Sequence, residues 1–376
     1  MTNTEQPITI MNPENVGIDR YQEEGREYDA ILVMSFGGPE GVEQVVPFLE
    51  NVTRGRGIPK ERLEEVGEHY YMFDGVSPIN QQNRDLIDAL RAELDAHGID
   101  LPIYFGNRNW HPMIGDTMQQ MQKDGVKRAV TFFTSGYSCY SGCRQYRENI
   151  VETQGNLGED APVFDKIRVF YNHPNFIEVN AESLEKALSQ FPDEKRQQVQ
   201  VAFTAHSIPM GMAQNSAYEA QLMETARLVA EMAGVTEWKL VYQSRSGPPQ
   251  VPWLEPDILD HMDELHQAGK DNLVILPIGF ISDHMEVMFD LDVEAKDKAE
   301  EHGMQMVRAA SAGTHPKFIS MIRELIQERM TDAPDRRYLG NRGPNHDVCP
   351  VTCCMPSARK RPARPQTGSA ESPRDR

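Results

Sequence analysis

The stretch "VQVAFTAHSIP" (199–209) decides the fold class, because an uninterrupted apolar run leads directly into the polar residues His206 and Ser207. An apolar run of this length predicts a strand that is buried on both faces of a sheet. Similar runs recur at 29–38, 101–110, 128–138, 166–174, 239–247 and 272–284. Amphipathic stretches with a helical period lie between them, for example at 82–98 and 216–234. This alternation predicts an α/β fold with parallel sheets.

The polar, helix-breaking region "ALSQFPDEKRQQ" (187–198) divides these runs into two sets. We therefore predict two doubly wound domains, at 28–190 and 191–312, with a ligand cleft between them. An N-terminal extension (1–27) precedes them. A cysteine-bearing segment (333–355) and a basic tail (356–376) lie near the other end. The tail is rich in Pro, Ala and Ser and has no apolar face, so we expect it to be disordered.

The charge balance narrows the class of partner. The chain of 376 residues has 57 acidic and 38 basic side chains, for a formal charge of −19. Such a surface repels nucleic acid, so we expect small-molecule substrates and no nucleic-acid role. No stretch approaches the ~18 consecutive apolar residues of a transmembrane helix, and the N-terminus shows no secretory signal. We expect a cytoplasmic monomer without an integral membrane segment.

A row of carboxylates follows the last apolar run. In "PIGFISDHMEVMFDLDVEA" (277–295), Glu286, Asp290 and Glu294 recur at i, i+4 and i+8, which places them on one helix face. A solvated acidic face is the alternative reading. The row, however, starts directly after a strand, at the mouth of the expected cleft. A lone histidine such as His206 is more often structural. Beside this row it suits the passage of protons or of a hydrated divalent metal.

Six ordered motifs now resemble those of the ferrochelatase family, whose members insert ferrous iron into a porphyrin. They are "LVMSFGGPEG", "DGVSPIN", "YFGNRNWHP", "FTAHSIP", "YQSRSGPPQVPWLEPD" and "PIGFISDHMEVMFDLDVEA", which run from about residue 28 to 330. The resemblance implies two Rossmann-like domains and a late helix (313–332) that packs back on the first. It also implies that His206 is the active-site histidine and Glu286 the key glutamate, with Asp290 and Glu294 as the acidic line beyond.

That chemistry suits these residues. A porphyrin must lose two pyrrole protons while Fe²⁺ sheds water and enters the ring. We expect a neutral His206, helped by Glu286, to accept protons or to ligate the substrate iron transiently. The row from Glu286 through Asp290 to Glu294 is expected to carry protons or metal. Some relatives have a tyrosine or methionine at the position of Phe36. Phenylalanine cannot ligate iron, so we expect Phe36 to pack on the macrocycle.

The segment expected at the entrance of the ligand cleft predicts which porphyrin is bound. Relatives that act on protoporphyrin carry an apolar lip between the first strand and the "GVSP" turn, whereas this segment (51–78) is polar, has no long apolar run and includes Arg54, Arg56, Lys60 and Arg62. A polar entrance with several basic side chains suits a substrate with four carboxylates, so we expect coproporphyrin III and coproheme, with protoporphyrin IX as the alternative. The candidate partners of the substrate carboxylates are Arg54, Arg56, Ser77 and Arg108. Two alternatives are equally open: Lys60 and Arg62 could belong to a solvated loop, and Arg108 could form a structural salt bridge.

The five cysteines form two groups, Cys139 with Cys143 and a C-terminal set in "HDVCPVTCCM" (346–355). In a cytoplasmic protein such groups indicate metal ligands or redox thiols rather than disulfides. Some ferrochelatases hold a [2Fe–2S] cluster on one internal and three C-terminal cysteines. "YSGCRQYREN" resembles actinobacterial-type members, which favours Cys143 over Cys139. The expected ligands are Cys143, Cys349, Cys353 and Cys354.

Several alternatives stay open at this point. Zinc or free thiols could replace the cluster, because the adjacent Cys353 and Cys354 can both ligate only across a sharp turn. Since the catalytic motifs contain no cysteine, the cluster would have a structural or redox-sensing role and tie the tail to Cys143. A sirohydrochlorin–cobalt chelatase is a further enzymatic alternative. A haem or iron–sulfur binding protein without turnover is the alternative from another class.

Overall fold

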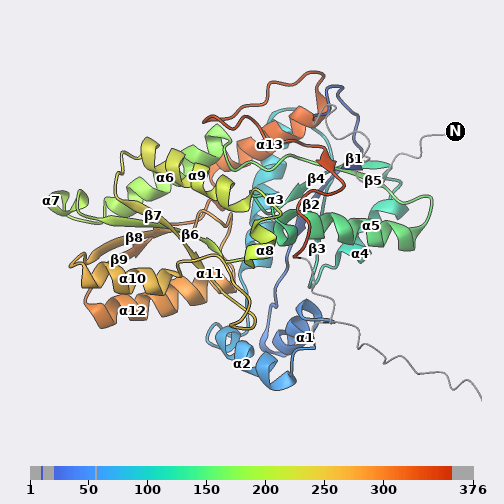
Figure 1. The fold of residues 1–376 in the computed structure, drawn as a ribbon. Coiled ribbons are helices and arrows are strands. Elements are labelled where there is room, and N and C mark those ends of the chain that lie inside the picture. The colour runs from blue at the N-terminus through green and yellow to red at the C-terminus, as the bar shows by residue number, and fades with distance from the viewer. Residues whose placement is uncertain (1–9, 12–20, 56, 358–376) are drawn as a thin grey trace, which may run out of the picture.

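Two four-stranded parallel sheets form the frame of the molecule, and helices cover them (Figure 1). We describe residues 10–11, 21–55 and 57–357 from a computed structural model. The first sheet has the order β3–β2–β4–β5, made of β2 (Ala30–Ser35), β3 (Ile103–Asn107), β4 (Arg128–Phe133) and β5 (Val163–Lys166). The second has the order β7–β6–β8–β9, made of β6 (Gln200–His206), β7 (Trp238–Gln243), β8 (Asn272–Leu276) and β9 (Gln305–Arg308). The predicted α/β fold class is confirmed.

The strand positions follow the apolar runs, with two differences. The run at 166–174 is not a strand, because β5 ends at Lys166 and the chain continues as buried coil. There its backbone bonds to a distant segment instead of a strand, since Leu339 N donates to Asn172 O at 2.9 Å. Strand β9 was not predicted, because it is only four residues long and none of its residues is fully buried.

Helices cover both faces of each sheet, as a parallel sheet requires. Those around the first sheet are α3 (Ile79–Ala96), α4 (Ile114–Lys123), η2 (Tyr140–Arg144), α5 (Gln145–Leu157) and α13 (Pro316–Met330). Those around the second are α6 (Pro174–Leu188), α9 (Tyr218–Met232), α10 (Ile258–Gln267), α11 (Met285–Phe289), η3 (Asp290–Glu294) and α12 (Ala295–His302). Two short helices are α7 (Asp193–Arg196) and α8 (Met210–Ala213). In Figure 1, α6 and α9 lie on one side of the second sheet, with α10 and α12 on the other.

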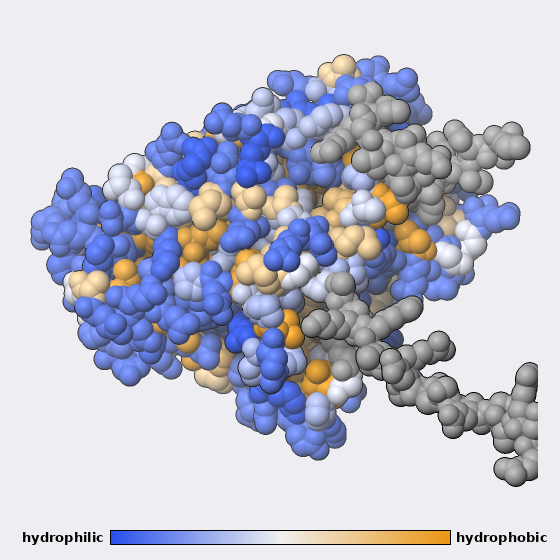
Figure 2. Space-filling model, in the orientation of Figure 1, coloured by the Kyte–Doolittle hydropathy of each residue, from blue (hydrophilic) through white to orange (hydrophobic). Residues whose placement is uncertain are grey.

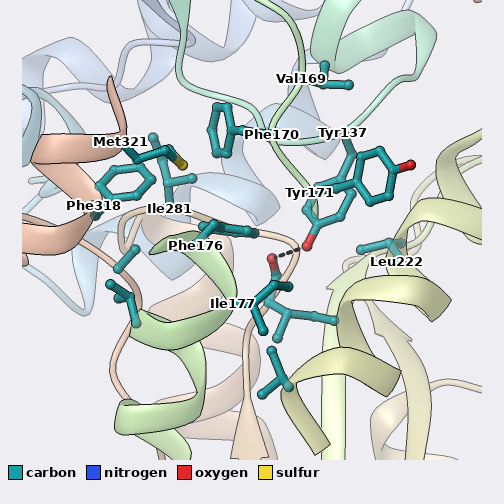
Figure 3. Close-up of a cluster of buried hydrophobic side chains, with 14 of the residues drawn as sticks. Tyr137, Val169, Phe170, Tyr171, Phe176, Ile177, Leu222, Ile281, Phe318 and Met321 are labelled. Atoms are coloured by element: carbon teal, nitrogen blue, oxygen red, sulfur yellow. Dashed lines mark hydrogen bonds between the residues drawn. The ribbon is translucent and has the colours of Figure 1, made fainter. Parts of the chain in front are cut away.

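One hydrophobic core runs through both halves. It contains Ile31 and Val33 of the first sheet together with Val201 and Phe203 of the second. Figure 3 shows its centre, where side chains of α6, α9 and α13 meet. The ring of Phe318 on α13 lies 5.9 Å from that of Phe170 and 6.1 Å from that of Phe176.

Helix α13 thus packs against α3 of the first half and against α6. Helix α6 precedes residue 190 but packs on α9 and β8, so it covers the second sheet. The domain boundaries drawn from the sequence stay predictions.

A C-terminal segment (331–357) runs back along the first sheet and pairs with buried polar groups. Arg329, at the end of α13, forms ion pairs with Asp165 (3.3 Å) and Asp347 (2.9 Å), and all three are almost fully buried. Within the segment, β10 (Cys349–Pro350) pairs in parallel with β1 (Ile10–Met11). The predicted disordered tail lies outside the described residues from 358 onward, as does most of the predicted N-terminal extension.

A helical hairpin formed by α1 (Val42–Val52) and α2 (Lys60–Tyr71) projects away from the sheets (Figure 1). It has a small core of its own around Phe48 and Leu63. Among the described residues, no helix combines the length and apolar character that crossing a membrane requires. The face in Figure 2 is predominantly hydrophilic, with hydrophobic residues in scattered patches.

Candidate active site

His206 and Glu286 come together at the carboxyl end of the second sheet. His206 is the last residue of β6, and Glu286 lies in the first turn of α11, which follows β8. The Nε2 atom of His206 is 3.5 Å from Oε2 of Glu286. The backbone of His206 is held in place because Tyr218 donates its hydroxyl to His206 O at 3.0 Å. The two residues are therefore joined as the sequence predicted, although they are far apart in the chain.

The pair favours its charged form. Burial would lower the pKa of His206, but the carboxylate of Glu286 outweighs it and raises that pKa to about 9. Burial would likewise raise the pKa of Glu286, but the imidazole of His206 lowers it to about 2. At neutral pH the pair is therefore an imidazolium and a carboxylate. This differs from the neutral His206 expected from the sequence, and the reason is the direct contact with Glu286.

His284 is a third member of this site that the sequence reasoning did not single out. It caps α11, since Glu286 N donates to its Nδ1 at 3.1 Å, and its ring packs edge-on against Phe280. Burial lowers its pKa. A neutral imidazole thus also lies near Glu286, with its Nδ1 3.9 Å from the Oε2 atom that His206 approaches. Its place in the "SDH" motif, two residues before the glutamate, was the available signal.

The acidic row continues along the helix through an unusual turn. Residues Asp290–Glu294 form a π-helical turn (η3), in which Ala295 N bonds to Asp290 O. In an α-helix of 3.6 residues per turn, positions four apart drift steadily around the axis. A π turn contains more residues than an α turn, so four residues rotate less around the axis and the drift is partly reversed. Such turns often mark functional sites. Glu286, Asp290 and Glu294 are therefore closer to one line than a regular helix allows.

Asp290 is the most perturbed carboxyl of the row. Burial raises its pKa to about 7, although a hydrogen bond from Ser244 lowers it. Ser244, whose hydroxyl donates to Asp290, has a φ of 62°, in the left-handed region that residues other than glycine adopt rarely. Burial also raises the pKa of Glu294. A carboxyl that titrates near neutral pH is suited to relay protons.

Arg308 fixes this helix to the sheet. From the end of β9 it reaches Asp292 (2.6 Å) on the π turn and Asp283 (3.1 Å) in the loop before α11. The backbone N–H of Asp283 also donates to Gln82 Oε1 of α3 at 2.8 Å. The loop before Glu286 is thus anchored to both halves of the protein.

Of the expected substrate contacts, Phe36 and Arg108 lie together beyond the carboxyl end of the first sheet. Phe36 directly follows β2 and remains 37% exposed. The guanidinium carbon of Arg108 is 5.9 Å from the Phe36 ring centre and 5.0 Å from that of Tyr146. The turn that directly follows Phe36 requires glycine at Gly37, where φ is +84° and a Cβ would lie 2.9 Å from Asn107.

The remaining expected contacts are placed differently. Ser77 is 4% exposed and packs beneath Gly38. Arg54 is exposed just after α1, whereas Arg56 lies outside the described residues. Lys60 and Arg62 form exposed ion pairs along α2, with Glu64 and Glu65, as a solvated helix face does. The structure itself does not test substrate contacts, so these assignments stay predictions.

The cysteines gather where the C-terminal segment crosses the start of α5. The thiol of Cys349 contacts that of Cys143, and the Cys353 and Cys354 sulfurs are 3.5 Å apart. Cys354 makes this possible with a φ of 54°, which is the sharp turn that adjacent ligands require. Cys139 instead caps its own turn, since Gly142 N donates to its Sγ at 3.1 Å.

A histidine extends this cysteine set. One ligand atom each of His346, Cys349 and Cys353 lies within 4.8 Å of the others, a spacing that a metal ion can bridge. His346 opens the quoted "HDVCPVTCCM" stretch but was not counted as a ligand. The donor set of thiolates and imidazole fits either an iron–sulfur cluster or zinc.

Comparisons with known proteins agree with the fold. In solved structures, SirB from Bacillus subtilis with Fe³⁺ superposes with a TM-score of 0.53 at 13% identity, covering 81% of this chain and all of SirB. This likeness shows a chelatase-type fold alone. The family model "Ferrochelatase" matches residues 28–330. The chain therefore belongs to the ferrochelatase family, and it is an enzyme that inserts metal into a porphyrin in haem biosynthesis.

Two curated relatives span nearly the whole chain. A ferrochelatase of Rhodopirellula baltica is 57% identical over 336 residues, which cover 89% of this chain and 95% of the relative. A coproporphyrin III ferrochelatase of Streptomyces coelicolor is 50% identical over 368 residues, covering 92% and 97%.

Proposed function

We propose that the enzyme inserts Fe²⁺ into coproporphyrin III to give coproheme. The observation that carries this choice is the exposed face of α2, where Lys60 pairs with Glu64 and Arg62 pairs with Glu65. The hairpin also exposes the apolar side chains of Val42, Ile58 and Tyr71, which lie on either side of these charged residues along the chain. A membrane-seated lip for a dicarboxylate porphyrin would present hydrophobic side chains instead. The likeness to the Streptomyces coelicolor enzyme supports the same substrate.

We assign His206 as proton acceptor and Glu286 as its partner. The resting pair holds a proton on His206, because Glu286 stabilises the imidazolium. Approach of Fe²⁺ adds a like charge, which lowers the pKa of His206 and releases this proton to the carboxylate row. The free Nε2 then takes a proton from a pyrrole nitrogen. Asp290, with a pKa of about 7, passes protons on toward Glu294 and solvent.

The substrate is tested by anaerobic Fe²⁺ insertion with coproporphyrin III and protoporphyrin IX side by side. We expect kcat/KM to favour coproporphyrin III at least tenfold, a difference of about 1.4 kcal/mol. Equal rates, or a preference for protoporphyrin IX, would contradict the proposal. Arg54→Ala should raise KM for coproporphyrin III more than for protoporphyrin IX, since only the former has carboxylates on all sides.

The catalytic pair is tested by His206→Ala and Glu286→Gln. Each should lower kcat by a factor of about 10² or more, as expected when a positioned acid or base is lost. His266→Ala is the matched control, because His266 is an exposed histidine on α10. Wild-type turnover by His206→Ala would contradict the assignment.

We also propose that Cys143, Cys349, Cys353 and Cys354 hold a [2Fe–2S] cluster. The convergence of these thiols and the left-handed turn at Cys354 support it. The cluster, when bound, would supply a crosslink between the C-terminal segment and η2, with a redox potential of its own. Zinc on His346, Cys349 and Cys353 is the alternative that the geometry also accommodates.

A visible spectrum of anaerobically purified protein, with iron, sulfide and zinc counts, separates these two sites. Cys354→Ser and His346→Ala then separate the ligand sets. Loss of colour on Cys354→Ser, with His346→Ala still coloured, supports the four-cysteine cluster. The reverse pattern contradicts it. The cytoplasmic location and the monomeric state stay predictions.

A further inference from the structure

Two cations are buried beside the cysteines, and neither has a carboxylate partner within the described part of the chain. Arg147 on α5 is 2% exposed, and Lys166 at the end of β5 is 4% exposed. Among the described residues, no carboxylate lies within ion-pairing distance of either. The Nε and Nη1 atoms of Arg147 are buried and have no hydrogen-bond partner among the residues that the structure describes. The ammonium of Lys166 donates to the carbonyl of Ile167 at 3.4 Å, which is its one hydrogen bond within the same residues. Buried charge of this kind is costly unless an opposite charge compensates it.

The thiols are the groups positioned to supply that opposite charge. Arg147 follows Cys143 by four residues, which places it one turn further along the same side of the helix. Lys166 and Cys143 line the same small cavity. Burial would lower the pKa of both cations, but the thiols of Cys349 and Cys143 raise it above the ordinary value in each case.

The other charged groups near this site already have partners. Asp347 adds to the negative charge that raises the pKa of Lys166, but its own ion pairs are with Arg329 at 2.9 Å and with Arg336 at 3.4 Å. Arg144 pairs with Glu148 at 2.7 Å and also donates to Cys353 O at 3.0 Å. Arg147 and Lys166 are thus left to balance whatever negative charge the thiols carry.

The charge count matches one occupant. A [2Fe–2S] core on four thiolates carries two negative charges when oxidised and gains a third when it takes up one electron. Two buried cations neutralise the oxidised form and favour the reduced form still more. Zinc on two thiolates and one imidazole would carry no net negative charge, and both cations would remain uncompensated.

We propose that Arg147 and Lys166 are the counter-charges of the thiolate cluster site and hold its reduction potential above that of the same site without them. This inference rests on the proposed [2Fe–2S] cluster. The two residues act on the cluster through their charge, and take no part in metal insertion.

The test is an EPR-monitored redox titration of the anaerobically purified full chain with dithionite as the electron source. Arg147→Met and Lys166→Met delete each charge while keeping most of the side-chain length. Each should weaken the reduction equilibrium at least tenfold, a fall in midpoint potential of about 59 mV for one electron. Arg147→Lys and Lys166→Arg keep the charge and should stay near wild type. Lys239→Met removes an exposed charge on β7 and should have no effect.

Each outcome decides the question. Methionine variants with full iron and sulfide and a wild-type potential would overturn the inference. If the methionine variants lose iron while the charge-keeping variants retain it, the charge requirement is upheld. If both kinds lose iron, the residues act through shape, and the inference is wrong. A wild-type chain without iron and sulfide would overturn the cluster proposal itself, which is a separate result.

Discussion

The ring of His69 stacks on the ring of Phe289 with 3.7 Å between their centres and 8° between their planes. His69 lies near the end of α2, and Phe289 lies on the helix that carries Glu286. This contact joins the projecting hairpin to the active-site helix. Burial lowers the pKa of His69, so the stacked ring is neutral at physiological pH.

Loss of this stacking should free the hairpin. Phe289→Leu removes an aromatic contact worth about 0.5–1.5 kcal/mol, so opening of the hairpin should rise by up to about tenfold. Hydrogen exchange of residues 60–71 measures this opening. Met223→Leu, an exposed change on α9, serves as the control. Unchanged protection in Phe289→Leu would show that the stacking does not hold the hairpin.

The stability of the protein should depend on pH through the catalytic pair. His206 has a folded pKa raised to about 9 from an ordinary 6.5, so its contribution is full below 6.5 and is lost as pH rises through 9. Glu286, lowered to about 2 from 4.5, contributes above 4.5 and loses its contribution as pH falls through 2.

Urea unfolding of wild type and Glu286→Gln checks this dependence. The stability difference between them should be largest near pH 5.5 and vanish above about pH 10. A difference that persists at high pH would show that Glu286 acts through packing, because no charged pair remains there.

Arg308 should be a positioning residue for metal insertion. Arg308→Met removes both ion pairs of the loop and the π turn, and should reduce kcat at least tenfold while porphyrin affinity changes little. Arg308→Lys keeps the charge but cannot span both carboxylates with one fork, and should recover part of the activity. Fluorescence quenching gives the porphyrin affinity. Equal loss of affinity and kcat would indicate general damage to the fold instead.

The shared core should be sensitive at Phe318. Its ring is fully buried and contacts two other aromatic rings, so Phe318→Ala should lower the free energy of unfolding by about 3–5 kcal/mol. Met330→Ala on the same helix, at a 36% exposed position, should change it by about 0.5 kcal/mol or less. Chemical denaturation measures both, and similar values for the two variants would contradict the central role of this core.

The sequence allowed the sheets and the His206–Glu286 pair to be predicted, because strand-end residues of neighbouring parallel strands meet at one edge. It did not allow the protonation of that pair to be predicted. The protonation depends on a 3.5 Å contact between two residues that are 80 positions apart in the chain. The π turn was also missed, since spacing by four reads as a regular helix. Buried coil at 167–173 resembled a strand because burial, rather than pairing, selects its apolar residues.

The C-terminal segment changes when this protein can finish folding. One face of the first sheet is covered by α13, and Asp165 at its edge is paired with Arg329, which in turn needs Asp347. These partners follow the second half in the chain, whereas domains usually fold from the N-terminus during synthesis. Before residue 347 has been synthesised, Asp165 can pair with Arg128 of the neighbouring strand but the first sheet lacks the complete cover of α13 and the C-terminal segment. The same segment that completes the cover of the first sheet therefore also brings Cys349, Cys353 and Cys354 to Cys143.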